Sequence, residues 1–238
     1  YAMHAYLVGK DLTTLEREIA VYTESFLQLK QEASLHLNHI YWQAILNLRG
    51  YTENGHRLLG DAYNEEVMLP IHQQAQARGI IFQVYIHKLI LSYLFQKYAE
   101  AFENANLAEK YIDAVIGSML VPLFHYYDSL ARLAQFANVA PSEKRQILKR
   151  VATNQQKMKT WATHAPMNYL HKYYLVEAER ARVLQQDGDA REWYDRAINL
   201  AQQHEYLNDE ALAYELAGTF YFAKKHRQFA QLYLREAH

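Results

Sequence analysis

Apolar side chains return along much of the chain at steps of three and four residues. The clearest such stretch lies between residues 12 and 29, where these steps place the apolar positions on one face of a helix. Those positions are Leu12, Leu15, Ile19, Tyr22, Phe26 and Leu29. The pattern predicts an amphipathic α-helix there.

The same periodicity predicts helix after helix over the rest of the chain. Residues 1–8 already read as the end of a helix. Residues 49–60 contain three glycines and form the longest expected loop. Residues 80–96 are apolar nearly all round, so that helix should be buried on more than one side. The expected helices beyond residue 30 cover residues 32–48, 62–77, 80–96, 98–114, 118–137, 143–161, 168–185, 189–204, 208–223 and 228–238.

Glycine and small polar residues mark the expected turns between these helices. Gly79 is expected to end the helix over 62–77, and Asp187-Gly188 to join the helices over 168–185 and 189–204. Ser142 precedes a helical stretch and has a side chain that can cap the first turn. We therefore expect Ser142 at the N-cap of the helix that follows.

One spacing, Ala-x3-(Ala, Tyr or Leu)-x2-Ala, recurs three times. Small residues seven positions apart make a helix face against which a second helix can pack closely, which is typical of the second helix of a tetratricopeptide-like pair. The first copy is Ala101, Ala105 and Ala108, the second is Ala190, Tyr194 and Ala197, and the third is Ala230, Leu234 and Ala237. The spacing predicts a solenoid of stacked helix pairs.

The last two copies lie forty positions apart, because they begin at residues 190 and 230. Aligning them also aligns Tyr174 with Tyr214, and Ala178 with Gly218. Ala178 and Gly218 are then the small positions of the first helices, where the second helices approach. The earliest copy departs from this rule, since Leu89 stands at its corresponding position. It also begins eighty-nine residues before the second, at residue 101, so a longer, degenerate pair must lie between them.

These patterns predict an all-α fold: a right-handed superhelix of antiparallel helix pairs, a tetratricopeptide-like solenoid of about 11–12 helices. We expect one helical-repeat domain over residues 1–238. Residues 1–60 would form irregular helices, 61–165 degenerate repeats and 166–238 the best-defined repeats. The chain does not begin with Met, and residues 228–238 end inside an expected helix. Both observations indicate a segment of a longer protein.

Composition narrows the possible functions. Gly (8) and Pro (4) are scarce and half of the residues are apolar, which favours helices over a β-rich fold. The twenty tyrosines suit helix packing that reaches the surface, and we favour this role over an aromatic binding wall. Charges of both signs are interspersed around a net charge of −1, so no basic stripe indicates a nucleic-acid partner. The absence of cysteine fits a cytoplasmic protein, and no apolar run of about eighteen residues predicts a membrane span.

No group of residues predicts catalysis, a cofactor site or a metal site. His125, Asp128 and Ser129 are the residue types of a catalytic triad, but nearby positions of one helix cannot converge as a triad requires. His36 and His39 lie one turn apart, and no third metal ligand follows at a recognisable spacing. A glycine-rich phosphate loop is also absent from the sequence. We therefore expect a protein that is not an enzyme.

Four stretches resemble one family. They cover residues 121–131, 168–182, 194–198 and 210–217, and they are similar to the helical region of large bacterial, especially cyanobacterial, multi-domain kinases. Such proteins combine a serine/threonine kinase, a predicted NTPase, this helical region, a GAF sensor and a histidine kinase. The resemblance implies a role in signal transduction and in regulating a kinase. The kinase and NTPase motifs themselves are absent from this sequence, so neither activity is assigned to it.

A solenoid with tetratricopeptide geometry would bind a protein or peptide partner, such as a flanking domain of the same chain, in the groove lined by its first helices. An ordinary solvated face remains the alternative for these positions. A spacer that relays signals between flanking domains, and a small-molecule sensor, remain alternatives for the function. The expected groove positions are His87, Tyr93, Lys172, Glu179, Arg182, Glu215 and Phe222.

Overall fold

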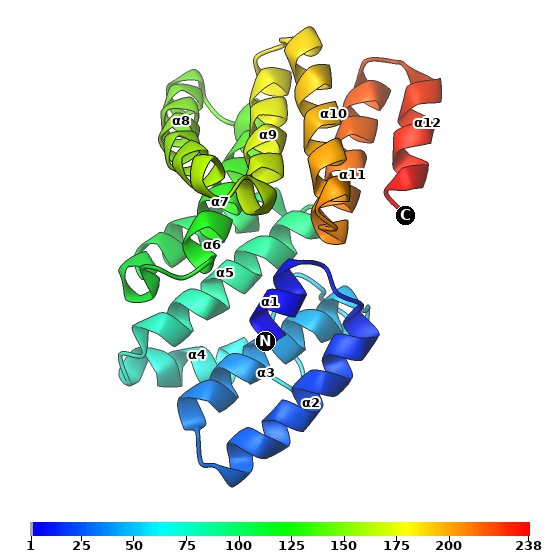
Figure 1. Cartoon of the computed structure of the whole chain (residues 1–238). Helices are drawn as coiled ribbons and strands as arrows, with labels where there is room; N and C mark the ends of the chain where they lie inside the picture. The colour runs from blue at the N-terminus through cyan, green and yellow to red at the C-terminus, as the bar shows by residue number, and fades with distance from the viewer. Residues whose placement is uncertain (1) are drawn as a thin grey trace. The chain divides into compact units, whose positions relative to one another are not determined.

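The computed structural model describes residues 2–238, and Tyr1, a part of the expected first helix, lies outside them. The described residues form α-helices, two short 3-10 helices and no strand (Figure 1). The helices pack against one another in pairs that are neighbours in sequence. The all-α, helical-repeat prediction is therefore confirmed.

The contacts group the chain into two compact units, Tyr1–Ala131 and Arg132–His238, with the division inside a helix. The predicted single domain stays a prediction. The helices of the first unit are α1 (Ala2–Leu7), α2 (Leu12–Gln28), α3 (Glu32–Leu48), α4 (Glu65–Gln74), α5 (Arg78–Leu94), α6 (Tyr98–Glu109), η1 (Ile112–Val115) and most of α7 (Leu120–Gln135). Those of the second unit are η2 (Phe136–Asn138), α8 (Pro141–His164), α9 (Pro166–Val183), α10 (Asp187–Gln203), α11 (Leu207–Ala223) and α12 (Arg227–Glu236).

In the first unit α5 is the central helix. It contacts α3, α4, α6 and η1, and the ring of Phe82 packs against that of Phe124 on α7 at 6.2 Å. Its side chains are buried on most of its circumference, including Ile86 and Leu89, which are fully inaccessible to solvent. The prediction from residues 80–96 of a helix buried on several sides is confirmed, because an apolar surface all round needs neighbours all round.

Residues 49–64 connect α3 to α4 as an irregular loop. The predicted helix over 62–77 begins later, because Asn64 accepts the backbone N–H of Glu66 and so caps α4. The buried Glu65 carboxylate then ties the loop to the helices. It accepts the backbone N–H of Leu58 at 3.0 Å and the ammonium group of Lys88 on α5 at 2.8 Å.

Six of the turns between helices have the same form. Each has three residues, and the middle one has a positive φ of 51–62° although none of the six is glycine. In the turn from α9 to α10, the Gln185 N–H bonds to the Arg182 carbonyl at 3.1 Å, and the Gln186 N–H bonds to the Ala181 carbonyl at 2.9 Å. This pattern satisfies the last carbonyls of a helix. The six middle residues are Lys30, Gln76, Gln96, Gln185, Glu205 and Lys225.

This recurring turn corrects two predictions. Gly79 does not end α4, and Asp187-Gly188 is not a connecting turn, because these residues lie in the first turns of α5 and α10. In both places the chain reverses at a glutamine with positive φ just before them. The prediction of Ser142 as an N-cap is also wrong. The N-cap of α8 is Ala140, because Pro141 occupies the favoured first helical position and Glu143 accepts the N–H of Ala140.

Helix α6 is shorter than predicted. The predicted helix over 98–114 ends at Glu109, and residues Ile112–Val115 form the 3-10 helix η1. Arg78 at the start of α5 fixes this segment, since its guanidinium donates to the Lys110 carbonyl at 2.8 Å and to the Asp113 carboxylate at 2.5 Å.

The earliest alanine copy lies on this shorter helix. Ala101, Ala105 and Ala108 are all inaccessible to solvent, and α6 packs against α5. Ala108 was expected well inside a helix that continued to residue 114, but it stands one residue before the end of α6. The chain turns there because the Ala108 carbonyl accepts the N–H of Tyr111 at 3.0 Å, a 3-10 type of bond. The alanine face of α6 that packs closely against α5 therefore ends at Ala108.

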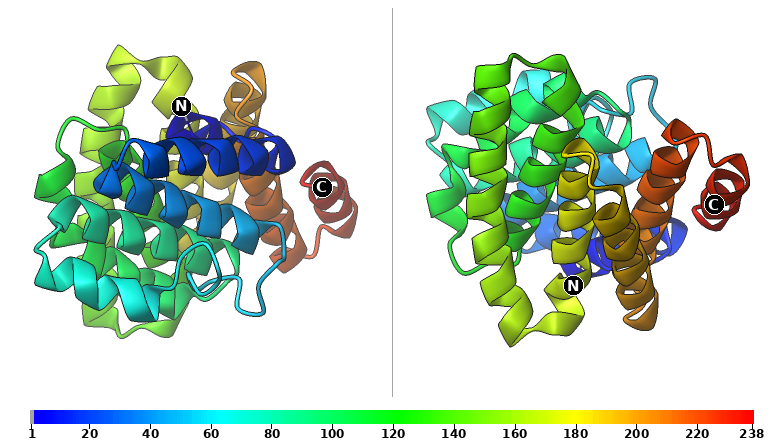
Figure 2. Two further views of the ribbon diagram at one scale, coloured as in Figure 1. Left: turned by 90° about the horizontal axis from the view of Figure 1, so that it is seen from below. Right: turned by 90° about the horizontal axis from the view of Figure 1, so that it is seen from above.

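In the second unit the helices from α9 to α12 stand side by side and alternate in direction (Figures 1 and 2). Helix α9 contacts α10, α10 contacts α11, and α11 contacts α12. The predicted repeat positions line these contacts. Ala178, Ala190, Tyr194, Ala197, Gly218 and Ala230 are buried, while Leu234 and Ala237 near the end of the chain are partly buried.

Candidate functional site

The structure does not place the predicted groove positions on one open surface. Four of them are interior side chains, with exposed fractions of 1% for His87, 3% for Tyr93, 6% for Lys172 and 2% for Glu179. The prediction that these four face an open groove is wrong, because each is covered by neighbouring helices of its own unit. The Lys172 ammonium and the Glu179 carboxylate bond to side chains of neighbouring helices instead of solvent.

His87 lies among aromatic rings in the first unit. Its ring centroid stands 4.5 Å from that of Tyr41 and 5.6 Å from that of Tyr6. Its Nδ1 lies 2.7 Å from the Gln83 carbonyl oxygen and donates its proton to it in the neutral ring. Complete burial lowers the pKa of the His87 imidazole to about 4, against the upward influence of that hydrogen bond. His87 is therefore a neutral packing residue near pH 7.

Lys172 on α9 belongs to a buried charged cluster that reaches α11. Its ammonium group lies 2.7 Å from Asp209 Oδ2 and 4.2 Å from the ring centroid of Tyr206. His171 Nε2 lies 3.1 Å from the same carboxylate oxygen. Burial alone would raise the pKa of Asp209, but Lys172 and His171 outweigh it and hold that pKa well below its usual range. Burial lowers the pKa of His171.

Glu179 and Arg182 do contact each other, within α9. The Arg182 guanidinium donates to both carboxylate oxygens of Glu179, at 2.9 and 2.6 Å. The Tyr194 hydroxyl on α10 donates to the same carboxylate. Glu215 is half-buried on α11, whereas Phe222 near the end of that helix is 66% exposed. Of the seven predicted positions, four are therefore interior, Arg182 and Glu215 are half-buried, and Phe222 is exposed.

The residues considered for catalysis lie on α7, with their side chains turned into the protein interior. His125, Asp128 and Ser129 are buried, and the Ser129 hydroxyl donates to the backbone carbonyl of His125 at 2.7 Å. The His36 ring packs edge-on against that of His72, with centroids 4.8 Å apart. Within residues 2–238, no group of three or more His, Asp or Glu side chains could hold a metal ion.

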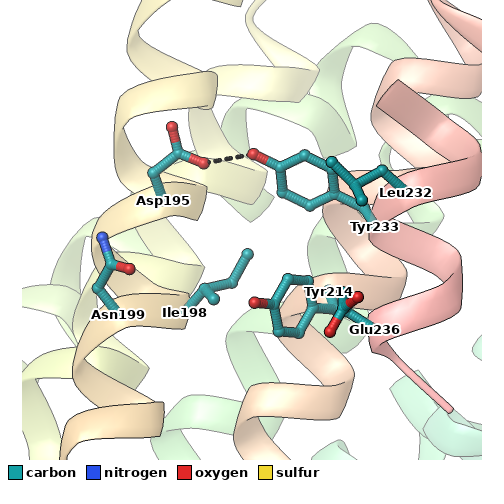
Figure 3. Close-up of a pocket in the computed structure, with 7 residues that line it drawn as sticks. All are labelled: Asp195, Ile198, Asn199, Tyr214, Leu232, Tyr233 and Glu236. Atoms are coloured by element: carbon teal, nitrogen blue, oxygen red, sulfur yellow. Dashed lines mark hydrogen bonds between the residues drawn. The ribbon is translucent and has the colours of Figure 1, made fainter. Parts of the chain in front are cut away.

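A pocket of about 490 Å³ opens between α10, α11 and α12 in the second unit (Figure 3). It is a surface pocket formed by α11, the first helix of its pair, and by the second helices of two consecutive pairs, α10 and α12. Its lining residues are Asp195, Ile198 and Asn199 from α10, Tyr214 from α11, and Leu232, Tyr233 and Glu236 from α12. We name it the α10–α12 pocket and take it as the candidate binding site.

Apolar and aromatic side chains shape the α10–α12 pocket. Ile198 is buried, whereas Leu232 is 53% exposed at the rim. The rings of Tyr214 and Tyr233 meet edge to face, with centroids 5.9 Å apart and an interplanar angle of 61°. The Tyr233 hydroxyl donates to Asp195 Oδ1 at 2.7 Å and so links α12 to α10 across the pocket (Figure 3). This bond fixes the Tyr233 ring.

The electrostatic character of the pocket is acidic. Its lining set holds the carboxylates of Asp195 and Glu236 and no Lys, Arg or His. Partial burial raises the pKa of Glu210, and the nearby Glu236 raises it further. Partial burial also raises the pKa of Tyr214, with contributions from the negative charges of Glu210, Glu236 and Asp195. The pocket therefore presents negative charge beside aromatic faces.

No local pattern in the sequence marks this pocket. Its residues come from three helices and are spread over about forty positions, so no short spacing connects them. One signal was present: the alignment that pairs Tyr174 with Tyr214 also pairs Trp193 with Tyr233, which repeats an aromatic pair at the same place in two consecutive repeats. The second copy of that pair, Tyr214 and Tyr233, lines the pocket.

Comparisons with known proteins add no relative: no family model matches the chain, and neither a curated protein nor a solved structure matches it. Over the described part of the chain, no helix combines the length and the apolar character needed to cross a membrane.

Proposed function

We propose that this chain is a helical-repeat module that binds a protein or peptide and carries out no catalysis. The observation that supports this proposal is the α10–α12 pocket. It is open to solvent, three helices of consecutive repeats form it, and it combines apolar and aromatic side chains with exposed polar groups. Pockets of this composition are typical of binding sites, in which apolar surface provides affinity and a few polar groups provide specificity.

A small-molecule sensor is the second candidate. The volume of about 490 Å³ lies within the usual range for small-ligand pockets, which is roughly 300–1,000 Å³. The open rim with Leu232 and Asn199 exposed favours a ligand that continues over the surface, as a peptide does. We therefore place peptide binding first.

The cellular setting is part of the same proposal. A chain without cysteine and without a membrane-spanning helix among its described residues suits the cytoplasm. The resemblance of residues 121–131 and 168–182 to the helical region of bacterial multi-domain kinases supports a role in signal transduction. Sequencing the complete reading frame tests this, since a kinase or NTPase domain in the same frame is the expected result.

Peptide binding is tested by selecting a phage-displayed random peptide library on the full chain. Selected peptides are then titrated calorimetrically into wild type and two variants, Leu232→Ser and Phe222→Ser. Both side chains are exposed, so neither change should unfold the protein. Leu232 lines the pocket, and its loss should weaken binding about tenfold, as expected when an apolar side chain that the ligand covers is removed.

Phe222→Ser is the matched control, because it removes an exposed apolar side chain of α11 outside the pocket. Its affinity should stay within about twofold of wild type. Two results would contradict the proposal: selected peptides that bind no better than scrambled ones, or peptides whose binding depends on Phe222 and not on Leu232. A thermal-shift screen that finds small molecules but no peptide would support the sensor instead, since a ligand raises stability by mass action.

A further inference from the structure

The two consecutive helix pairs of the second unit carry the same aromatic pair, but only the first covers it with a positive charge of its own. In the α9–α10 pair the rings of Tyr174 and Trp193 lie 5.1 Å apart. The guanidinium carbon of Arg196 lies 5.0 Å from the Trp193 centroid and 5.8 Å from that of Tyr174. Such distances allow cation–π attraction.

Forty residues later, the α11–α12 pair repeats the rings and inverts the charge. Tyr214 corresponds to Tyr174, Tyr233 to Trp193, and Glu236 to Arg196. The two tyrosine rings again make contact, at 5.9 Å. Where the first pair supplies a guanidinium, this pair presents a carboxylate, and Asp195 adds a second one from α10. The aromatic pair is left beside two negative charges and no cation from the lining set.

We infer that the α10–α12 pocket recognises a positively charged side chain, the guanidinium of an arginine or the ammonium of a lysine, on the bound peptide. The inference rests on the proposed function and names the chemistry of its ligand. An external cation restores there the arrangement that Arg196 completes within the preceding repeat. The Arg196 guanidinium of the preceding repeat thus indicates the chemical group that we expect on the ligand.

Each lining group has a part in this recognition. Glu236 is exposed on α12 and is placed to accept hydrogen bonds from the cation. Asp195 accepts the Tyr233 hydroxyl through Oδ1, and its carboxylate lies on the α10 wall of the pocket. The faces of Tyr214 and Tyr233 attract a cation through their ring electrons. Ile198 and Leu232 are placed to pack along the aliphatic stem of a long cationic side chain.

The test uses an arginine-containing peptide from the library selection and the same peptide with citrulline in place of arginine. Citrulline keeps the shape and removes the charge. Wild-type protein should bind the citrulline peptide about tenfold more weakly, because two partly exposed ion pairs and a cation–π contact are lost. In the Asp195→Asn/Glu236→Gln double variant, which keeps side-chain volume and both tyrosine rings, the difference between the two peptides should shrink to about two- to fivefold, the share of the cation–π contact. Asp189→Asn, an exposed charge on α10 outside the pocket, should leave the difference unchanged.

The outcomes separate this inference from the proposed function. Peptides that bind through Leu232 but lose nothing on citrulline substitution, or selections without arginine and lysine, overturn the inference and leave peptide binding standing. If free agmatine, a small guanidinium cation, binds the pocket and no peptide does, the ligand is a small molecule, and both the inference and the proposed function are wrong. A charge-dependent loss in wild type that shrinks in the double variant, and stays unchanged in Asp189→Asn, supports both.

Discussion

Leu234 on α12 lies directly against Gly218 on α11. A Cβ atom built on Gly218 would stand 2.7 Å from Leu234 Cγ and 3.3 Å from its backbone nitrogen. The preceding pair has the small residue Ala178 and the large residue Tyr194 at the corresponding places, and both are buried. Close approach of the two helices thus requires one small and one large residue.

Substituting Gly218→Ala should destabilise the protein by about 1–3 kcal/mol, because the added methyl group overpacks a full contact. This loss should exceed the gain in helix propensity, about 1 kcal/mol for glycine to alanine. In a Leu234→Ala background the same change should be at least about 1 kcal/mol less harmful. Urea denaturation of the four proteins of this cycle measures the coupling. A coupling of zero would mean that the two residues do not limit the approach of the helices.

The six turns with a positive φ predict stabilising substitutions. Gln185→Gly should stabilise the protein by about 0.5–1 kcal/mol, because glycine adopts this backbone conformation without a steric penalty. Gln156→Gly is the matched control, since Gln156 is an exposed glutamine within α8, where glycine should cost about 1 kcal/mol. Thermal unfolding measures both effects. Equal destabilisation by the two changes would contradict this account of the turn.

Because burial lowers the pKa of His87, the protein should become less stable in mild acid. Its pKa is about 4 in the folded chain and 6.5 in the unfolded chain, so the unfolded state takes up the proton first as the pH falls. The stability that His87 contributes is complete above pH 6.5 and is lost as the pH falls towards about 4. The shift corresponds to about 3 kcal/mol. Unfolding midpoints at pH 7, 5.5 and 4.5 should therefore decline less in His87→Phe than in wild type.

The control for this pH dependence is His164→Phe, at an exposed histidine that ends α8. It should decline with pH as wild type does. If His87→Phe and wild type show the same slope between pH 6.5 and 4, the buried imidazole does not have the lowered pKa.

The buried pair Lys172–Asp209 should be strongly coupled. Asp209→Asn or Lys172→Met alone should cost about 3–5 kcal/mol, because each leaves an uncompensated charge in the interior. The double variant should cost clearly less than the sum of the two. Guanidinium-induced unfolding of the single and double variants gives the coupling energy. Strict additivity would show that the two groups act independently.

The helices were predictable because their signals are local. The spacing of apolar residues predicted the helix over 32–48 with the observed bounds of α3. The turns were predicted less well, since a glutamine such as Gln185 gives no sign of a positive φ, whereas the glycine three positions later invites a turn assignment. The turn is held by backbone bonds to the last carbonyls of the preceding helix, which form with Lys, Gln or Glu at this position, so no residue type marks it.

The earliest alanine copy shows what pattern alone missed. Leu89 stands at the position of Gly218, and this departure is explained by Ala105, which stands at the position of Leu234. The large and small residues have changed places, and both are fully buried in the packed pair α5–α6. The prediction considered only the small residue on the first helix, so it could not show that a small residue on the second helix compensates for the large Leu89.

The candidate binding site could not be predicted from the sequence for a similar reason. Lys172 and Glu179 look like surface residues in the sequence, because the partners that allow their burial, Asp209 and Tyr194, come from other helices. The α10–α12 pocket likewise exists only where three helices converge. Its repeated aromatic pair was visible in the sequence, but the charge change between Arg196 and Glu236 has meaning only beside the packed rings.

The most direct test of the account is hydrogen–deuterium exchange on the full chain with and without a selected arginine-containing peptide. The account predicts added protection in α10 around Asp195–Asn199, in α11 around Tyr214 and in α12 around Leu232–Glu236. Protection concentrated elsewhere, for example around Phe222 at the end of α11, with none in α12, would contradict it.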